Sequence, residues 1–436
     1  MTEFLLWLLV LSGAAILVWG WQRPDRMIQF PFVAAVVFMG WVTPQLLGLT
    51  SYPSRPQGAL EKTTFMAWLC LLACWAGYVF NRRPARLFEW RFARRRLVWA
   101  SAVLSLLGAF FFYQVSLLAV DVIATFGGQW TGVITIYIFL ARLLTVGFAM
   151  ALLLHLAKPT WLTLIIVLFG LSFYLDRILI HGRRADAVEL CLMVLMALWF
   201  QRRWLPPRGL MMGVFLLGAL FVNSIGDYRS TMLGKDQYSW SGAGVAKIFE
   251  IDFGGNLRDI VEGKQPSYEL SNAMLSIEAA DRRVDFDYGV SLWNGFVQRY
   301  IPGQLLGPGV KRSLYIERED SARQLFGLVP HLGSTMTGLT DAFQSLWFFG
   351  ASKFFLIGFI MSRWWHAARA GDRVAQMVLM LCIGASMHAI THTTHHFFLV
   401  FVEIVAFLLP ALLYARVPSH RRAMRAPAQA ENALSG

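Results

Sequence analysis

Cysteine is scarce in this chain of 436 residues, and its positions argue against a disulfide framework. All four cysteines lie inside apolar stretches: Cys70, Cys74, Cys191 and Cys382. None lies in the long polar segment of residues 225–341, so we expect neither disulfides nor a cysteine-based zinc site there. The N-terminus also lacks the basic residues that open a signal peptide. Glu3 stands in their place, and we interpret residues 4–20 as a retained membrane span.

The sequence also lacks a glycine-rich phosphate-binding loop and any internal repeat. An enzyme without a nucleotide site would use a substrate that is already activated. The net charge of +13 could indicate nucleic-acid binding, but the basic residues lie mostly in short segments between apolar runs. Lys and Arg in such segments hold a membrane protein in one orientation. We therefore expect no nucleic-acid partner.

Long apolar runs dominate what is present, and 57% of the residues are hydrophobic. A run of about 20 apolar residues can cross a bilayer as a helix. Eleven runs predict an all-α polytopic membrane protein: 4–20, 27–49, 65–80, 97–120, 133–156, 161–180, 187–200, 209–224, 343–364, 374–390 and 397–414. The chain divides accordingly into four regions: a bundle of residues 1–224, a large outer loop 225–341, a second bundle 342–415 and a basic tail 416–436.

The basic residues also predict an orientation. The stretch 81–96 holds seven arginines, so we place it in the cytoplasm. Alternating crossings then put the other short basic segments on the same side: 21–26, 201–208, 362–373 and the tail. The N-terminus faces outward and the C-terminus inward. Three polar segments share the outer face: 181–186, 225–341 and 391–396.

Several arginines are candidates for binding a phosphate group. Arg183 and Arg184 stand at an outer helix mouth, where a double arginine can clamp a diphosphate. The alternative is two interfacial arginines that reach lipid headgroups. Arg142 lies well inside the fifth span, where a charge is costly. It either binds substrate or pairs with an acid such as Glu403 or Asp176.

Two further features lie near the outer face. We expect an interfacial half-helix broken at Gly350 and a ninth span that begins near Ser352, which places Lys353 at the outer edge. Four histidines cluster in sequence: His388, His392, His395 and His396. Their spacing matches no zinc motif. We predict no metal and no cofactor, and one histidine could instead act as a base or a phosphate ligand.

The large loop contributes the remaining candidates. Arg229 follows the eighth span directly. Residues 286–302 predict an amphipathic helix ended by Pro302, whose aromatic side chains either line a sugar site or pack on the bilayer surface; Arg299 within it is a candidate substrate contact. His331 or Asp341 could deprotonate a sugar hydroxyl.

Three runs resemble the Wzy-like repeat-unit polymerases of O-antigen and exopolysaccharide synthesis. They are Gly182 with Arg183 and Arg184; Asp287, Tyr288 and Gly289 with Ile301 and Pro302; and the glycine-rich run from Gly333 through Asp341 to Phe349 and Gly350. The chain departs from the family at two points. The family often has Glu where Asp341 aligns, and a small residue directly after the arginine of its outer turn.

The resemblance implies an inverting, metal-independent membrane glycosyltransferase with a GT-C-like fold, in the bacterial inner membrane with its large loop in the periplasm. Its substrate would be an undecaprenyl-diphosphate-linked oligosaccharide, which it polymerises. Arg183, Arg184 and Arg229 would stabilise the leaving diphosphate, with Arg142 as a deeper contact. The implied partners are membrane lipid and the flippase and chain-length regulator of the same pathway.

Three other functions stay open. An O-antigen ligase would use the same donor with a lipid A-core acceptor, and would need an outer histidine, for which His331 is a candidate. A transporter or flippase for lipid-linked glycans is a second alternative, although the eight spans before the loop and three after it do not form related halves. A non-enzymatic partner in a polysaccharide assembly complex is the third.

Overall fold

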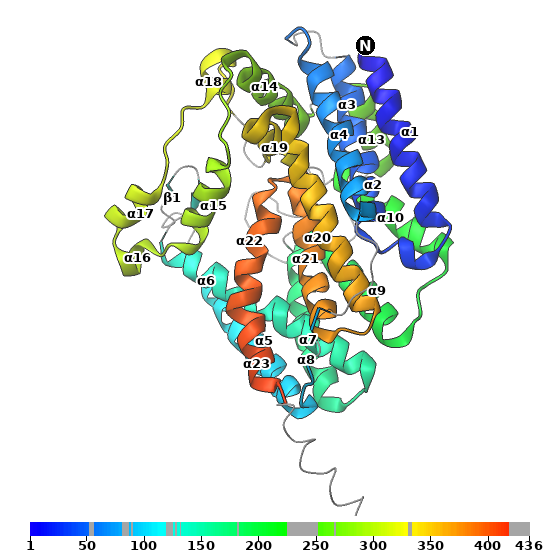
Figure 1. Ribbon diagram of the computed structural model, residues 1–436, viewed down its shortest axis with the longest axis vertical. Helices are drawn as coiled ribbons and strands as arrows, with labels where there is room; N and C mark the ends of the chain where they lie inside the picture. The colour runs from blue at the N-terminus through cyan, green and yellow to red at the C-terminus, as the bar shows by residue number, and fades with distance from the viewer. Residues whose placement is uncertain are drawn as a thin grey trace, which may run out of the picture.

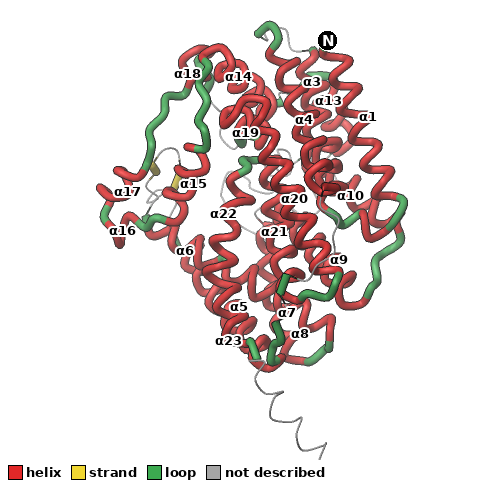
Figure 2. Tube along the Cα trace, in the orientation of Figure 1, coloured by secondary structure: helices red, strands yellow, loops and turns green. Residues whose placement is uncertain are grey.

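The computed structural model describes residues 1–51, 56–80, 87–88, 90–118, 125–126, 129–130, 132–180, 183–224, 252–265, 267–329 and 334–417. Most of these residues are helical, and the strands among them are two antiparallel pieces of two residues each, β1 (Thr125–Phe126) and β2 (Gln129–Trp130). Figures 1 and 2 show an elongated bundle in which most helices run along the long axis.

Nine helices among the described residues are long and apolar enough to cross a membrane. They are α1 (Thr2–Trp21); α2 (Phe30–Val37) with η2 (Phe38–Val42) and α3 (Thr43–Thr50); α4 (Ala59–Phe80); α5 (Arg94–Ser116); α6 (Val133–Ala141) with α7 (Leu143–Ala157); α8 (Trp161–Leu175) with η4 (Asp176–Ile180); α19 (Gly338–Leu346) with η6 (Trp347–Ala351) and α20 (Ser352–Arg369); α21 (Arg373–Thr391); and α22 (His395–Glu403) with η7 (Ile404–Leu408) and α23 (Leu409–Ala415). The prediction of a polytopic α-helical membrane protein is confirmed at this level.

The two other predicted spans also form helices, but neither is among these nine. They are α9 (Arg184–Arg202) and the shorter apolar helix α10 (Arg208–Asn223). Helix α9 carries charged residues in its first turns, and helix α10 is shorter than the nine. Eleven crossings therefore stay a prediction.

The described part of the large loop is a set of short helices: α13 (Phe253–Val261), α14 (Tyr268–Arg283), α15 (Val290–Tyr300), α16 (Gly303–Leu306), α17 (Pro308–Leu314) and α18 (Ser321–Phe326). A short 3-10 turn, η1 (Pro24–Arg26), follows α1. Figure 1 shows α14 and α18 at the end of the bundle that holds the N-terminus, and α15 to α17 along one side. Lys62 on α4 bonds Glu278 on α14 at 2.9 Å, which ties the loop to the bundle. The predicted helix within 286–302 is confirmed as α15.

Burial separates central helices from peripheral ones. In α21, 83% of the span is buried within the protein, against 22% in α5 and 28% in α8. Large apolar side chains on the peripheral helices point away from the protein, such as Leu106 on α5 and Ile165 on α8. An apolar outer surface of this kind needs apolar surroundings, which a bilayer supplies.

Helices α4 and α20 cross closely because glycines face backbone at the crossing. A Cβ on Gly77 would collide with the carbonyl oxygen of Phe355, and one on Gly358 with that of Cys74. Small residues at a crossing let helix backbones approach, as is typical of membrane helices.

The basic segments gather at one end of the bundle. Arg94 donates to the carbonyl oxygen of Leu154 at 3.1 Å, Arg96 to that of Tyr414 at 3.3 Å, and Arg203 to that of Arg369 at 3.2 Å. Figure 1 shows α23 at this end and the N-terminus at the other. That the two termini lie on opposite sides of a membrane stays a prediction. Which end faces the cytoplasm stays a prediction.

The expected break before α20 is present, but not at the glycine. Helix α19 ends at Leu346, and Trp347 has a φ of 53°, a backbone conformation that residues other than glycine rarely adopt. Gly350 instead lets the chain pack onto the carbonyl oxygen of Ala342. Helix α20 begins at Ser352, as predicted, so Lys353 lies in its first turn.

Candidate functional site

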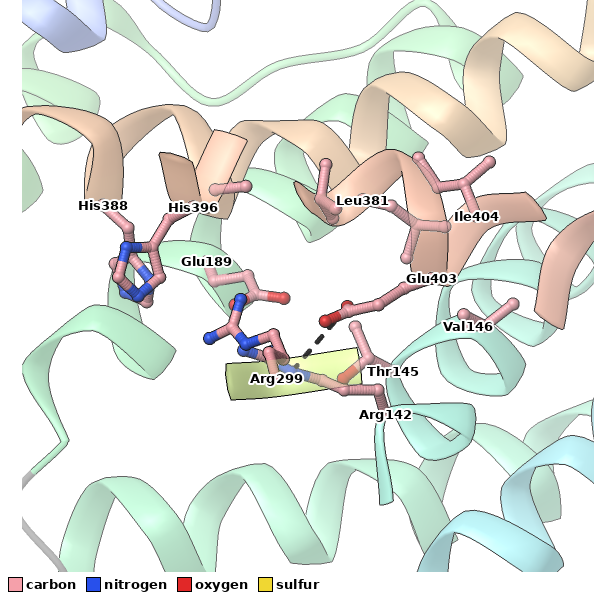
Figure 3. Close-up of a pocket in the computed structure, with 12 residues that line it drawn as sticks. Arg142, Thr145, Val146, Glu189, Arg299, Leu381, His388, His396, Glu403 and Ile404 are labelled. Atoms are coloured by element: carbon pink, nitrogen blue, oxygen red, sulfur yellow. Dashed lines mark ion pairs between the residues drawn. The ribbon is translucent and has the colours of Figure 1, made fainter. Parts of the chain in front are cut away.

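A polar cavity lies where α15 of the large loop meets helices α7, α9, α21 and α22 (Figure 3). It is lined by Arg142, Thr145, Val146, Glu189, Arg299, Leu381, Ala385, His388, His396, Val400, Glu403 and Ile404. Two arginines, two carboxylates and two histidines thus share one site inside an apolar bundle. Ionisable residues within membrane helices are costly, and they usually mark a functional site.

Arg142 and Glu403 form an ion pair across the cavity, with Arg142 Nε and Glu403 Oε2 3.9 Å apart. Arg142 stands at the junction of α6 and α7, and Glu403 is the last residue of α22 before the π-helical turn η7. Of the two partners that the sequence suggested, the structure shows Glu403. At 3.9 Å the pair is longer than a strong charge-assisted hydrogen bond of about 2.7–2.9 Å. The pair is therefore loose enough for the phosphate of a substrate to compete with Glu403 for the guanidinium.

Glu189 is the second carboxylate of the cavity. Its side chain is buried in α9, and its Oε1 accepts a hydrogen bond of 3.2 Å from the hydroxyl of Tyr174 on α8. Glu189 also fills the space left by Gly384 of α21, where any Cβ would collide with its carboxylate. Glu189 is not among the candidates that the sequence predicted.

A second buried pair adjoins Tyr174. Arg177 Nε lies 3.4 Å from Asp186 Oδ2, and the guanidinium of Arg177 lies over the Tyr174 ring at 4.6 Å. Neither of the two paired atoms has a hydrogen-bond partner among the described residues. A line of interacting polar side chains therefore extends from this pair through Tyr174 to Glu189 at the cavity.

Helix α15 carries Arg299 into the site from the loop. The neighbouring Tyr300 donates through its hydroxyl to the carbonyl oxygen of Leu399 at 2.9 Å and to Glu403 Oε1 at 3.3 Å. Burial raises the pKa of the Tyr300 hydroxyl, and the charge of Glu403 raises it further. Tyr300 therefore stays a donor at neutral pH and holds α15 against α22.

The four histidines lie together at one side of the cavity. The rings of His388 and His396 are 5.8 Å apart, those of His388 and His392 are 5.1 Å apart, and those of His395 and His396 are 4.8 Å apart. Thr393 Oγ1 lies 2.9 Å from both His395 Nε2 and His396 Nδ1. In the part of the chain that the structure describes, no group of three or more His, Cys, Asp or Glu side chains could hold a metal ion.

Asp341 lies outside the cavity lining, in a buried anchor. Its Oδ2 accepts from Lys353 Nζ at 3.3 Å, from the Thr394 N–H at 3.0 Å, and from the Thr394 hydroxyl. These contacts join α19, α20 and the turn between α21 and α22. The other oxygen, Oδ1, has no hydrogen-bond partner among the described residues. The geometry favours a structural role for Asp341, and its role as a base stays a prediction.

The other predicted contacts are less defined. Arg183 is exposed at the N-cap of α9, and its backbone N–H donates to the carbonyl oxygen of Arg177 at 3.0 Å. Arg184 is the first residue of α9, and its side chain lies outside the described part. Arg229 and His331 also lie outside the described residues. The diphosphate clamp by Arg183, Arg184 and Arg229 stays a prediction.

The run Asp287, Tyr288 and Gly289 starts α15. Asp287 accepts from the Gly289 N–H at 2.8 Å, from the Ser291 N–H at 3.3 Å and from the Ser291 hydroxyl. Burial by itself raises the pKa of Asp287, but these hydrogen bonds outweigh it and hold the pKa below its usual range. This motif therefore positions the helix that delivers Arg299.

Comparisons of the chain with protein-family models, with curated proteins and with solved structures found no match. The resemblance to repeat-unit polymerases thus stays an expectation from three short motifs.

Proposed function

We propose that this protein is a membrane glycosyltransferase that polymerises lipid-diphosphate-linked oligosaccharide repeat units. One observation carries the proposal: Arg142 from a membrane helix and Arg299 from the large loop line the same buried cavity as Glu189 and Glu403. Two cations can hold a diphosphate, and a carboxylate beside them can take a proton. The apolar bundle suits a substrate that is anchored in the bilayer.

The chemistry assigns one role to each group. The acceptor hydroxyl attacks the anomeric carbon of the donor, and the new glycosidic bond forms as the bond to the diphosphate oxygen breaks. The electron pair leaves with the lipid diphosphate, whose charge Arg142 and Arg299 stabilise. The hydroxyl proton passes to Glu189, which accepts a hydrogen bond from the neutral hydroxyl of Tyr174. Glu403 is instead paired with the cation Arg142, and a nearby cation makes a carboxylate the weaker base.

The small size of the cavity limits how substrate enters. Its volume of about 30 Å³ holds water but not a sugar, since ligand pockets span roughly 300–1,000 Å³. Helix α15 is held to α22 by few polar contacts, chiefly those of Tyr300. Substrate would enter as α15 moves away from α22, and Arg299 would then follow the diphosphate.

The test is the length of the surface polysaccharide. The gene is deleted in its host and restored with wild type, Arg299→Ala or Arg323→Ala. Arg323 is an exposed arginine of α18 in the same loop and serves as the matched control. We expect a ladder of polymer with wild type and the control, and single repeat units with Arg299→Ala. An unchanged polysaccharide after deletion would refute the proposal.

A ligase and a transporter give other outcomes in the same host. Long polymer stranded on its lipid carrier after deletion would favour the O-antigen ligase. Repeat units trapped on the cytoplasmic side would favour transport, for which the buried acids and histidines of the cavity are also suited.

A further inference from the structure

A second cavity lies at the end of the bundle that gathers the basic segments. It has a volume of about 160 Å³ and is lined by Arg94, Leu97, Leu153, Leu154, Ala157, Gln201, Arg373, Gln376 and Met377. These residues come from α5, α7, α9 and α21. On α21 the nearest lining residues of the two cavities, Met377 and Leu381, lie four positions apart, about 6 Å of helix, and no residue lines both cavities. The two cavities are therefore separate sites.

The cavity is cationic. Arg94 and Arg373 line it, and none of its nine lining residues is acidic. Arg94 donates to backbone carbonyl oxygens, those of Leu154 at 3.1 Å and of Lys158. Neither arginine forms an ion pair with a carboxylate that the structure describes.

The nearest acid in sequence, Asp372, is fully engaged elsewhere. Its carboxylate accepts from the N–H groups of Leu87 at 3.0 Å, Phe88 at 2.6 Å, Val374 at 3.0 Å and Ala375 at 3.1 Å. It caps α21 and pins the segment before α5, so its oxygens do not reach out to Arg373. The positive charge of the cavity is left for an external anion.

The walls suit a ligand with an apolar part. Leu97, Leu153, Leu154 and Met377 form apolar lining, and Gln201 and Gln376 contribute a polar patch joined by a side-chain hydrogen bond of 2.9 Å. A free inorganic anion would gain nothing from the leucines. A phospholipid would place its phosphate at the arginines, and its glycerol and first methylenes along the leucines.

We propose that this cavity binds the headgroup phosphate of an anionic phospholipid between Arg94 and Arg373. The rest of the lipid lies outside it, because about 160 Å³ is less than the roughly 300–1,000 Å³ of a pocket that encloses a whole ligand. Basic pockets between membrane helices at the cytoplasmic side bind anionic headgroups in this way. The inference does not rest on the proposed function, because it uses another cavity and other residues.

The test uses the full-length protein purified in a neutral detergent, with lipid binding read by native mass spectrometry and by thermal unfolding. Phosphatidylglycerol, phosphatidylcholine and inorganic phosphate are the probes. We expect phosphatidylglycerol to bind and to raise the unfolding temperature, and phosphatidylcholine at the same concentration to do neither. Arg373→Gln should weaken phosphatidylglycerol binding about fivefold, as expected for one arginine near a phosphate, and the charge-reversed Arg373→Glu should weaken it further.

Arg95→Gln is the matched control, because Arg95 is exposed one residue from Arg94 and does not line the cavity. It should leave binding unchanged, which would support a specific site. The side chain of Arg373 is exposed, so the Arg373 variants should elute and unfold like wild type when no lipid is added. Equal binding of phosphatidylcholine, equal loss with Arg95→Gln, or displacement of lipid by equimolar inorganic phosphate would each overturn the proposal.

Discussion

Substituting both members of the Arg142–Glu403 pair separates its structural role from its chemical one. The two charges are 3.9 Å apart, which corresponds to about 4 kcal/mol of attraction at an effective dielectric constant of about 20. Arg142 keeps 32% of its side chain exposed and Glu403 11%. Solvent screening of the exposed arginine reduces the coupling to about 1–3 kcal/mol.

Thermal unfolding in detergent, followed by tryptophan fluorescence, measures this coupling. Arg142→Gln and Glu403→Gln should each lower the unfolding temperature, because each leaves one charge uncompensated in an apolar bundle. The double variant should lose less than the sum of the two. An exposed pair, Arg258 with Glu262 at 2.7 Å, is the control, and its coupling should be much smaller despite the shorter distance.

Polysaccharide length in cells adds the second readout for the same variants. If Arg142 binds the diphosphate, the double variant regains stability but still makes no polymer. If the double variant regains both stability and polymer synthesis, the Arg142–Glu403 pair has a structural role alone. Losses in unfolding temperature that simply add would refute the ion pair itself.

Three further predictions concern packing, pH and the buried anchor. Gly77→Ala should lower the free energy of unfolding by about 1–3 kcal/mol, because the added methyl group overpacks against α20. Gly213 has open space around it, so Gly213→Ala should not destabilise the protein. Paired thermal scans measure both variants, and equal effects would contradict the close crossing of α4 and α20. The pKa of Asp287 is lowered in the folded protein, so its contribution to stability is complete above about pH 4 and is lost as the pH falls through its folded pKa. Between pH 7 and pH 3, the unfolding temperature should therefore decline less steeply for Asp287→Asn than for wild type. Superimposable profiles of unfolding temperature against pH would count against this. Asp341→Asn and Lys353→Gln should lower stability alike, since each breaks the same anchor; a stable Asp341→Asn protein without polymerising activity would instead make Asp341 catalytic.

Sequence reasoning recovered the parts of the fold that depend on local pattern. Apolar runs located the helices, and Pro302 marked the end of α15 within a residue or two. The polar Lys353 in an apolar run indicated a new helix start at Ser352, because burying its charge would be costly. The same argument indicated that Arg142 either binds substrate or pairs with an acid, and it named Glu403 among the possible partners.

The site itself depends on contacts that periodicity does not encode. Glu189, Arg299 and Glu403 are far apart in sequence and meet only through the packing of α9, α15 and α22. Asp341 and Lys353 looked like separate features, although they bond each other. The signal that could have identified Glu189 was its charge on an apolar helix face.

Reconstitution from purified components is the sharpest test of polymerisation by this protein. Purified protein in proteoliposomes is given a polyprenyl-diphosphate-linked oligosaccharide, and polymer length and released polyprenyl diphosphate are measured for wild type and Glu189→Gln. We expect a ladder of polymer and stoichiometric release of polyprenyl diphosphate with wild type. We expect neither with Glu189→Gln at equal protein concentration and equal unfolding temperature. Polymer formation by Glu189→Gln at the wild-type rate would contradict the assignment of Glu189 as the base, and no polymer from wild type would contradict the polymerase itself.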